Sequence, residues 1–167
     1  HCCRSCRLGR PGQLWQTLEQ AMTLPAWRIA SDEKASMKLD KNAKILIAED
    51  EPISRQILHS MLTSFGFKYI YEASNGIEAL ALGREHRPRY ALLDIYMPQM
   101  DGWEVVKHFK KELPNTLLIM ITGSRDMNDI DKSFSEDVDS YFFKPFQKNV
   151  LLEKMTDLAK KRPVKDS

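Results

Sequence analysis

Short apolar runs alternate with longer amphipathic stretches from residue 44 to residue 161. Each run has the five to seven residues typical of a strand, and the stretches between runs carry apolar residues at helical spacing. The pattern predicts strands at 44–48, 68–73, 90–94, 116–122 and 140–144. It predicts helices at 52–66, 75–86, 101–113, 126–136 and 148–161, of which 126–136 is the weakest.

The expected helices have recognisable start and stop residues. Pro52 stands in a first helical turn, where proline is favoured, and Gly66 ends the same helix. Asn75 and Asp101 precede the second and third helices and have side chains that cap a helix amino end. These signals support the predicted alternation of strand and helix.

The alternation also predicts the fold class. Parallel strands need crossover connections, so strands that alternate with helices indicate an α/β doubly wound sheet with helices on both faces. The runs at 44–48, 90–94 and 116–122 are almost entirely apolar, as in central strands that are buried on both faces. The run at 68–73 contains Lys68 and Glu72, which predicts an edge strand.

Some of the chain is expected to lie outside this domain. A length of 167 residues with 43% hydrophobic content suits one core with some chain left over. We expect an N-terminal extension or linker at 1–42, the folded domain at 43–162 and a tail at 163–167. All three cysteines lie within the first six residues, so no disulfide is expected in the domain.

Charge and hydropathy argue against two classes of partner. The formal net charge of +2, from 25 basic and 23 acidic residues, gives no sign of the concentrated basic face that nucleic acid needs. No apolar stretch approaches the roughly 20 residues that span a bilayer. We therefore expect a cytoplasmic segment that contacts neither nucleic acid nor membrane.

Polar side chains stand at the ends of the expected strands. Glu49 and Asp50 follow the first strand, Asp94 ends the third, Thr122 ends the fourth and Lys144 ends the fifth. The carboxyl ends of parallel strands meet at one rim of the sheet, where such folds bind ligands. A single polar residue at a strand end is commonplace. Three carboxylates, a hydroxyl and an ammonium at one rim indicate a site.

The chemistry of this rim predicts phosphoryl transfer. Crowded carboxylates repel one another, and a hard divalent cation relieves the repulsion, so Mg²⁺ is expected. A cation, a lysine and a hydroxyl around one carboxylate stabilise charge on the oxygens of a transferring phosphoryl group. Asp94 is then predicted to act as a nucleophile that forms an acyl phosphate.

Four segments resemble one known family. They read LIAEDEP, YALLDIYMPQMDG, IMITGS and YFFKPF, and in this order and spacing they are similar to the receiver domain of two-component response regulators. The resemblance covers residues 44–161 and implies the flavodoxin-like receiver fold with strand order 2-1-3-4-5.

The resemblance implies catalytic and switch residues. Asp94 matches the phosphoacceptor, with Lys144 and Thr122 as the other catalytic positions. Thr122 and Tyr141 match the switch pair, a hydroxyl that moves toward the phosphoryl group and an aromatic ring that then rotates.

The resemblance also implies the metal ligands. Mg²⁺ would be held by Glu49, Asp50 and Asp94 together with the backbone carbonyl of Tyr96. The acidic pair is Glu-Asp where Asp-Asp is commoner, so Glu49 is expected to reach the metal through water. Pro145 resembles the cis proline that follows the family's lysine.

The resemblance implies two kinds of partner. The donor would be a phosphohistidine protein, either a histidine kinase domain or a phosphotransfer protein. A downstream partner would dock near the fourth helix, fifth strand and fifth helix. The chain would not be an enzyme, apart from self-catalysed transfer to Asp94 and slow autodephosphorylation. His59, His86 and His108 are interpreted as surface or partly buried helix residues, not as phosphate donors.

Two hypotheses for the parent protein stay open, and one alternative function from another class. In the first hypothesis the chain is a stand-alone regulator, and in the second it is the terminal receiver of a hybrid histidine kinase. Residues 10–21 resemble the last helix of a preceding receiver, although a plain amphipathic linker helix explains them as well. The alternative from another class is a small flavodoxin-like flavin-binding protein or phosphatase. Against it, the domain has no glycine-rich phosphate loop and no cysteine.

Overall fold

A parallel sheet forms the centre of the computed structural model, which describes residues 39–123 and 138–163. Its five strands are β1 (Lys44–Ala48), β2 (Tyr69–Ala73), β3 (Tyr90–Asp94), β4 (Leu117–Thr122) and β5 (Ser140–Phe143). The order is β2-β1-β3-β4-β5, and each neighbouring pair is parallel. The predicted strand order and the predicted edge position of β2 are thereby confirmed.

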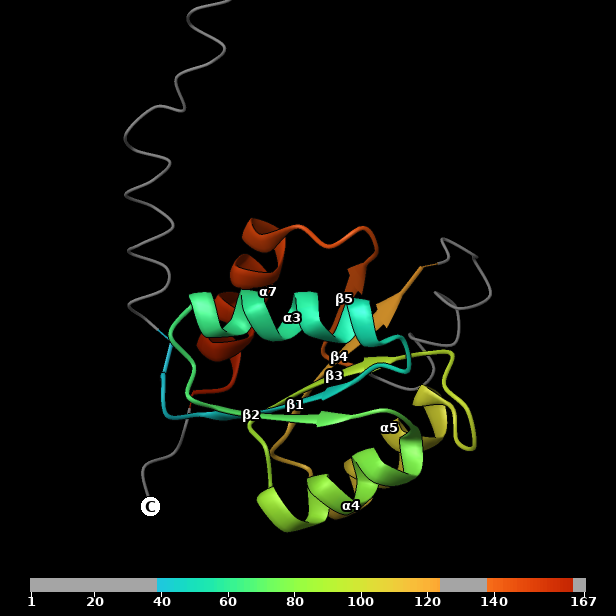
Figure 1. Cartoon of the computed structure of the whole chain (residues 1–167). Coiled ribbons are helices and arrows are strands. Elements are labelled where there is room, and N and C mark those ends of the chain that lie inside the picture. Colours follow the sequence, from blue (N-terminus) through green and yellow to red (C-terminus); the bar gives the residue numbers. More distant parts are fainter. Residues whose placement is uncertain (1–38, 124–137, 164–167) are drawn as a thin grey trace, which may run out of the picture. The chain divides into compact units, whose positions relative to one another are not determined.

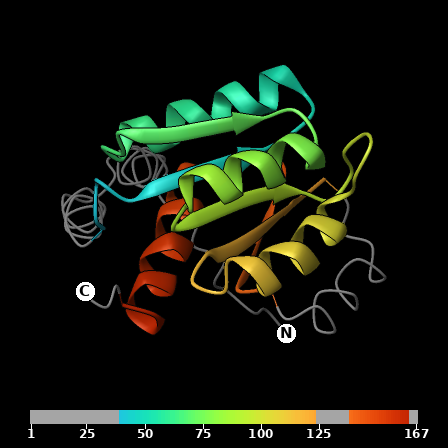
Figure 2. The same ribbon diagram turned by 90° about the horizontal axis from the view of Figure 1, so that it is seen from below.

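Helices cover both faces of the sheet. α3 (Pro52–Ser64) and α7 (Lys148–Lys161) lie over one face, and α4 (Gly76–His86) and α5 (Gly102–Glu112) lie over the other (Figures 1 and 2). These elements agree with the predicted ranges to within two residues at each end. The helix predicted at 126–136 and the extension up to residue 38 lie outside the described residues.

The central strand β1 shows why the sheet is buried on both faces. Side chains alternate along a strand, so Ile45 and Ile47 join the core beneath α3 and α7, whereas Leu46 and Ala48 join the core beneath α4 and α5. None of the four is more than 1% exposed. Full burial of one aliphatic side chain contributes about 1.5–3 kcal/mol, so the two cores hold the strand in place.

Two helices begin at the caps that the sequence predicted. Asn75 Oδ1 accepts a hydrogen bond from the Glu78 amide, and Asp101 Oδ1 accepts one from the Glu104 amide, each at 2.9 Å. Such caps satisfy backbone donors that have no partner inside the helix, and each contributes about 1 kcal/mol. Both helices therefore start at the rim where β2 and β3 end.

The folded body includes residues on the amino-terminal side of β1. Leu39 is 4% exposed and belongs to the core beneath α3 and α7. Lys41 Nζ donates a hydrogen bond of 2.6 Å to the carbonyl of Phe65, just after α3. The end of the predicted linker thus packs on the domain. In the described part of the chain, no helix is long and apolar enough to cross a membrane.

Candidate functional site

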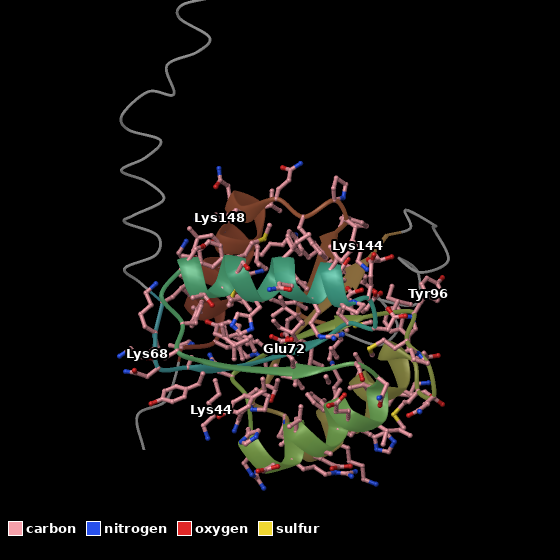
Figure 3. All side chains as sticks on the ribbon, in the orientation of Figure 1. Lys44, Lys68, Glu72, Tyr96, Lys144 and Lys148 are labelled. Carbon is pink, nitrogen blue, oxygen red and sulfur yellow. The ribbon has the colours of Figure 1, made fainter. Side chains whose placement is uncertain are left out.

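The carboxyl ends of the strands meet at one rim of the sheet. Figure 3 shows Lys144 and Tyr96 at the end toward which the strands run, with Lys44 and Lys68 at the opposite end. Lys144 follows β5 and Tyr96 follows β3, so residues that are far apart in sequence approach one another only at this rim.

Three carboxylates form a cluster at the rim. Glu49, Asp50 and Asp94 each place an oxygen within 4.8 Å of the others. Glu49 is fully buried and Asp94 is 5% exposed, whereas Asp50 is exposed to solvent. The cluster therefore has two buried acids and one acid that opens to water.

Lys144 joins the two buried carboxylates. Its ammonium Nζ lies 2.8 Å from Glu49 Oε1 and 2.8 Å from Asp94 Oδ2. The backbone amide of Lys144 donates to the carbonyl of Thr122 at 2.9 Å, which ties the end of β5 to the end of β4. The peptide bond between Lys144 and Pro145 is cis, as the resemblance implied.

Burial and hydrogen bonds shift the pKa values of Glu49 and Lys144. Loss of solvation raises the pKa of Glu49 from 4.5 to about 7, although the hydrogen bond from Lys144 opposes the shift; the nearby charge of Asp94 raises it further. Burial lowers the pKa of Lys144, but its hydrogen bonds to Asp94 and Glu49 outweigh this, so the net shift is upward. The lysine stays charged while Glu49 titrates near neutral pH.

The loop after β3 is folded tightly against the rim. The Tyr96 amide donates to Asp94 Oδ1 at 3.3 Å, and the Gly102 amide donates to the Ile95 carbonyl at 3.0 Å. A Cβ atom on Gly102 would lie 2.2 Å from the carbonyl oxygen of Asp94, so a side chain does not fit there. Glycine therefore allows α5 to begin directly beside the acceptor strand.

The two predicted switch residues lie on neighbouring strands. Thr122, the last residue of β4, is 1% exposed. Tyr141 on β5 pairs in register with Met120, and its ring centroid lies 6.4 Å from that of Trp103 and 6.3 Å from that of Phe143. Tyr141 therefore sits on the α5 side of the sheet, and β4 lies between its strand and β3, the strand that ends in Asp94.

Two features of the site were not predicted. Gly102 had no predicted role, although an Asp-Gly pair after a strand is a visible turn signal. Arg55 also had no predicted role, although its Nη1 donates a hydrogen bond of 2.6 Å to the carbonyl of Glu49. Its signal was weak, because an arginine within a helix is usually a solvated surface residue.

The residues present fit a divalent cation. Three carboxylates supply the oxygen ligands that hard cations prefer. Glu49 Oε2 is buried and has no hydrogen-bond partner within residues 39–123 and 138–163. A buried carboxylate oxygen without a partner is costly, and a cation or a water bound to one would satisfy it. The roles of Asp50 and the Tyr96 carbonyl as ligands stay predictions.

Comparison with known proteins places the chain among signalling domains. Residues 45–156 match the model of the family described as response regulator receiver domain. Chemotaxis protein CheY of Bacillus subtilis is 30% identical over 110 residues, which are 66% of this chain and 92% of that protein. The probable transcriptional regulator ycf27 of Porphyra purpurea is 36% identical over 107 residues, which are 64% of this chain but only 43% of that protein.

Solved structures agree with this comparison. The receiver domain of a signal transduction histidine kinase from Syntrophus aciditrophicus has a TM-score of 0.67 at 28% identity, over 75% of this chain and 96% of that one. The receiver domain of AraT from Geobacillus stearothermophilus has a TM-score of 0.65 at 33% identity, over 71% of this chain and 94% of that one.

Proposed function

This chain belongs to the response regulator receiver family, whose members accept a phosphoryl group in two-component signalling, and from that premise we propose that Asp94 is the acceptor. The observation that carries this proposal is the contact of Lys144 Nζ with Asp94 Oδ2 at 2.8 Å, beside two further carboxylates. Lys144 and Thr122 are the proposed catalytic partners of Asp94.

A phosphohistidine protein is the proposed donor, as a histidine kinase domain or a phosphotransfer protein. A carboxylate oxygen of Asp94 attacks phosphorus, the bond from phosphorus to the imidazole nitrogen breaks, and that nitrogen keeps the electron pair. Where the other ring nitrogen carries no proton, the imidazolate that leaves takes one from water. The ammonium of Lys144 is already hydrogen-bonded to Asp94, so it stabilises charge on a phosphoryl group that arrives there.

Mg²⁺ is the proposed cation, held by Glu49, Asp50, Asp94 and the carbonyl of Tyr96. When bound, it would neutralise negative charge on the carboxylates and on the phosphoryl oxygens. The close approach of the three carboxylates and the unpartnered Glu49 Oε2 support this assignment.

Output is proposed to pass through Thr122 and Tyr141. The Thr122 hydroxyl would move toward the phosphoryl group, and the Tyr141 ring would rotate into the space it leaves. A downstream partner would then bind near β5, α7 and the helix predicted at 126–136, which lies outside the described residues. The support for this proposal is the adjacency of β4 and β5, with the Lys144 amide bonded to the Thr122 carbonyl.

The kind of protein that contains this receiver is also a proposal. The chain spans less than half of the ycf27 protein but nearly all of CheY, and a histidine kinase carries a similar receiver. A stand-alone regulator and a hybrid histidine kinase therefore both stay open, with a cytoplasmic location proposed for either. A flavin-binding or phosphatase function is not favoured, because the family assignment accounts for the same rim residues.

Phosphorylation by a small acyl-phosphate donor such as acetyl phosphate tests the acceptor. Intact mass spectrometry is expected to record one added phosphoryl group with Mg²⁺ present and none after chelation. Asp94→Asn is expected to abolish the gain while its circular dichroism spectrum matches wild type, because the amide keeps the shape but not the nucleophile. Asp101→Asn, which changes a helix cap near the rim, serves as the control and should still gain the group. An unchanged gain in Asp94→Asn would refute the assignment.

A further inference from the structure

Arg55 lies between the acidic turn and the edge strand. It is on α3, and its side chain is 19% exposed. Nη1 donates to the carbonyl of Glu49 at 2.6 Å and lies 3.4 Å from the carbonyl of Asp50. One guanidinium group thus contacts the backbone of both residues of the acidic pair.

Other contacts also hold the turn that carries the acidic pair, among them the bond from Lys144 Nζ to Glu49 Oε1. The Glu49 amide donates to the carbonyl of Ala73 on β2 at 3.1 Å. Glu51, the residue before α3, makes no side-chain hydrogen bond to the helix backbone, but its Oε2 accepts one of 2.5 Å from the Ser54 hydroxyl. By contrast, α4 and α5 begin at side-chain caps. Arg55 adds a side-chain contact with the carbonyls of Glu49 and Asp50, which these other contacts do not supply.

Glu72 and His59 hold Arg55 in turn. Glu72 lies on β2 beneath α3 in Figure 3, and its Oε2 lies 3.3 Å from Arg55 Nε. His59 Nδ1, one helical turn after Arg55, lies within hydrogen-bonding reach of Glu72 Oε1. The guanidinium is thus fixed at one side by carbonyls of the rim and at the other by a carboxylate of the edge strand.

We propose that Arg55 is a positioning residue for the cation site, and that it sets the place of Glu49 and Asp50 by holding their carbonyls. The inference rests on the proposed Mg²⁺ site of the receiver. Groups that hold metal ligands in place typically change metal affinity by about 10–100-fold when removed. Arg55 acts through backbone, so we expect about tenfold, at the lower end of that range.

The two possible roles of Arg55, positioning of the turn and charge repulsion, predict opposite changes in Mg²⁺ affinity when Arg55 is removed. A guanidinium beside the acidic cluster repels a cation, so if Arg55 acted only through its charge, its removal would tighten Mg²⁺ binding. If Arg55 holds the turn, removal would weaken binding despite the lost repulsion. The sign of the change therefore separates the two explanations.

Titration calorimetry with MgCl₂ on the full chain measures this sign. Arg55→Gln is expected to raise the Mg²⁺ dissociation constant about tenfold. Arg55→Lys keeps the charge but loses the fork that reaches carbonyl and carboxylate together, so it is expected to weaken binding severalfold. Glu72→Gln should weaken it less, because the carbonyl contact of Arg55 remains. Thermal unfolding with chelator present reports whether each variant is folded at the temperature of titration.

Arg84→Gln is the control. Arg84 lies in the last turn of α4, away from the rim, and pairs with Glu112 at 2.6 and 2.8 Å. Its loss should leave the Mg²⁺ dissociation constant unchanged. If Arg55→Gln binds Mg²⁺ as tightly as wild type or more tightly, the inference is wrong; should that variant fail to fold, unchanged affinity in Arg55→Lys overturns it equally. Wild type that binds no Mg²⁺ would instead contradict the proposed cation site itself.

Discussion

Glu49 and Lys144 respond to burial in opposite ways, and their pairing decides the charge of the site. Water is excluded from Glu49, which raises its pKa to about 7, whereas the hydrogen bonds to carboxylates keep Lys144 charged. Without a cation, part of the population carries a proton on Glu49 at neutral pH. The acidic pair noted in the sequence thus includes one residue whose charge depends on its burial, which no motif reveals.

This shift predicts a pH dependence of stability. The pKa of Glu49 is higher in the folded chain than its ordinary value of 4.5, so between those values the folded state binds more protons than the unfolded state. The free energy of unfolding should therefore fall as pH rises from 4.5 to about 7, by up to about 3 kcal/mol with metal chelated. Urea unfolding at several pH values measures the slope.

Glu49→Gln should flatten this slope, because the amide does not titrate. Glu112→Gln is the control: the hydrogen bond from Arg84 lowers the pKa of Glu112 from 4.5 to about 2, so its contribution to stability changes mainly below pH 4.5 and not across this window. Two results would show that burial does not raise the pKa of Glu49. One is an unchanged pH dependence of the free energy of unfolding in Glu49→Gln, and the other is a free energy of unfolding that rises with pH in wild type.

At the scale of elements, features that depend on neighbouring residues could be predicted from the sequence, whereas contacts between elements could not. Asn75 and Asp101 were predicted as caps because a cap depends only on the residues beside it. Gly102 is required for a different reason, since the carbonyl of Asp94 approaches it from another element. Arg55 likewise meets its carbonyls only because α3 folds back along β1. Such approaches depend on packing, and sequence periodicity does not report them.

The neighbouring strands β4 and β5 give a prediction about signalling. Thr122→Ala should still allow phosphorylation of Asp94, because the acceptor carboxylate and the ammonium that contacts it, Lys144 Nζ, both remain. It should reduce the amide chemical-shift change on β5 by at least half when the phosphoryl mimic beryllofluoride is added with Mg²⁺. Thr116→Ala, at the opposite end of the sheet before β4, is the control and should respond in full. Full β5 shifts in Thr122→Ala would disprove the coupling.

Lys144→Ala should impair both steps. Its loss leaves Glu49 and Asp94 without the ammonium that joins them and removes charge stabilisation during transfer, which we expect to slow phosphorylation about a hundredfold. Stopped-flow or mass-spectrometric rates with acetyl phosphate measure the effect. A rate within a factor of about two of wild type would exclude Lys144 from the transfer step.

For the whole molecule, the fold class could be predicted from the few rules that govern parallel sheets, whereas the strand order β2-β1-β3-β4-β5 was implied by the family resemblance. Alternating strands and helices fix the doubly wound class, and the charges on 68–73 place that strand at the edge. The meeting of Glu49, Asp94 and Lys144 followed from the same rule, since carboxyl ends of parallel strands share a rim. The roles of Gly102 and Arg55 could be recognised only from the atomic positions.

The central claim, that this rim delivers a phosphoryl group to one carboxylate, is tested most directly by locating the modified residue. The chain is phosphorylated with acetyl phosphate and Mg²⁺, and borohydride reduction then converts an aspartyl phosphate to homoserine, which peptide mass spectrometry locates. We predict homoserine at position 94 alone. Homoserine at Asp50 or at another aspartate, with Asp94 unmodified, would contradict the account.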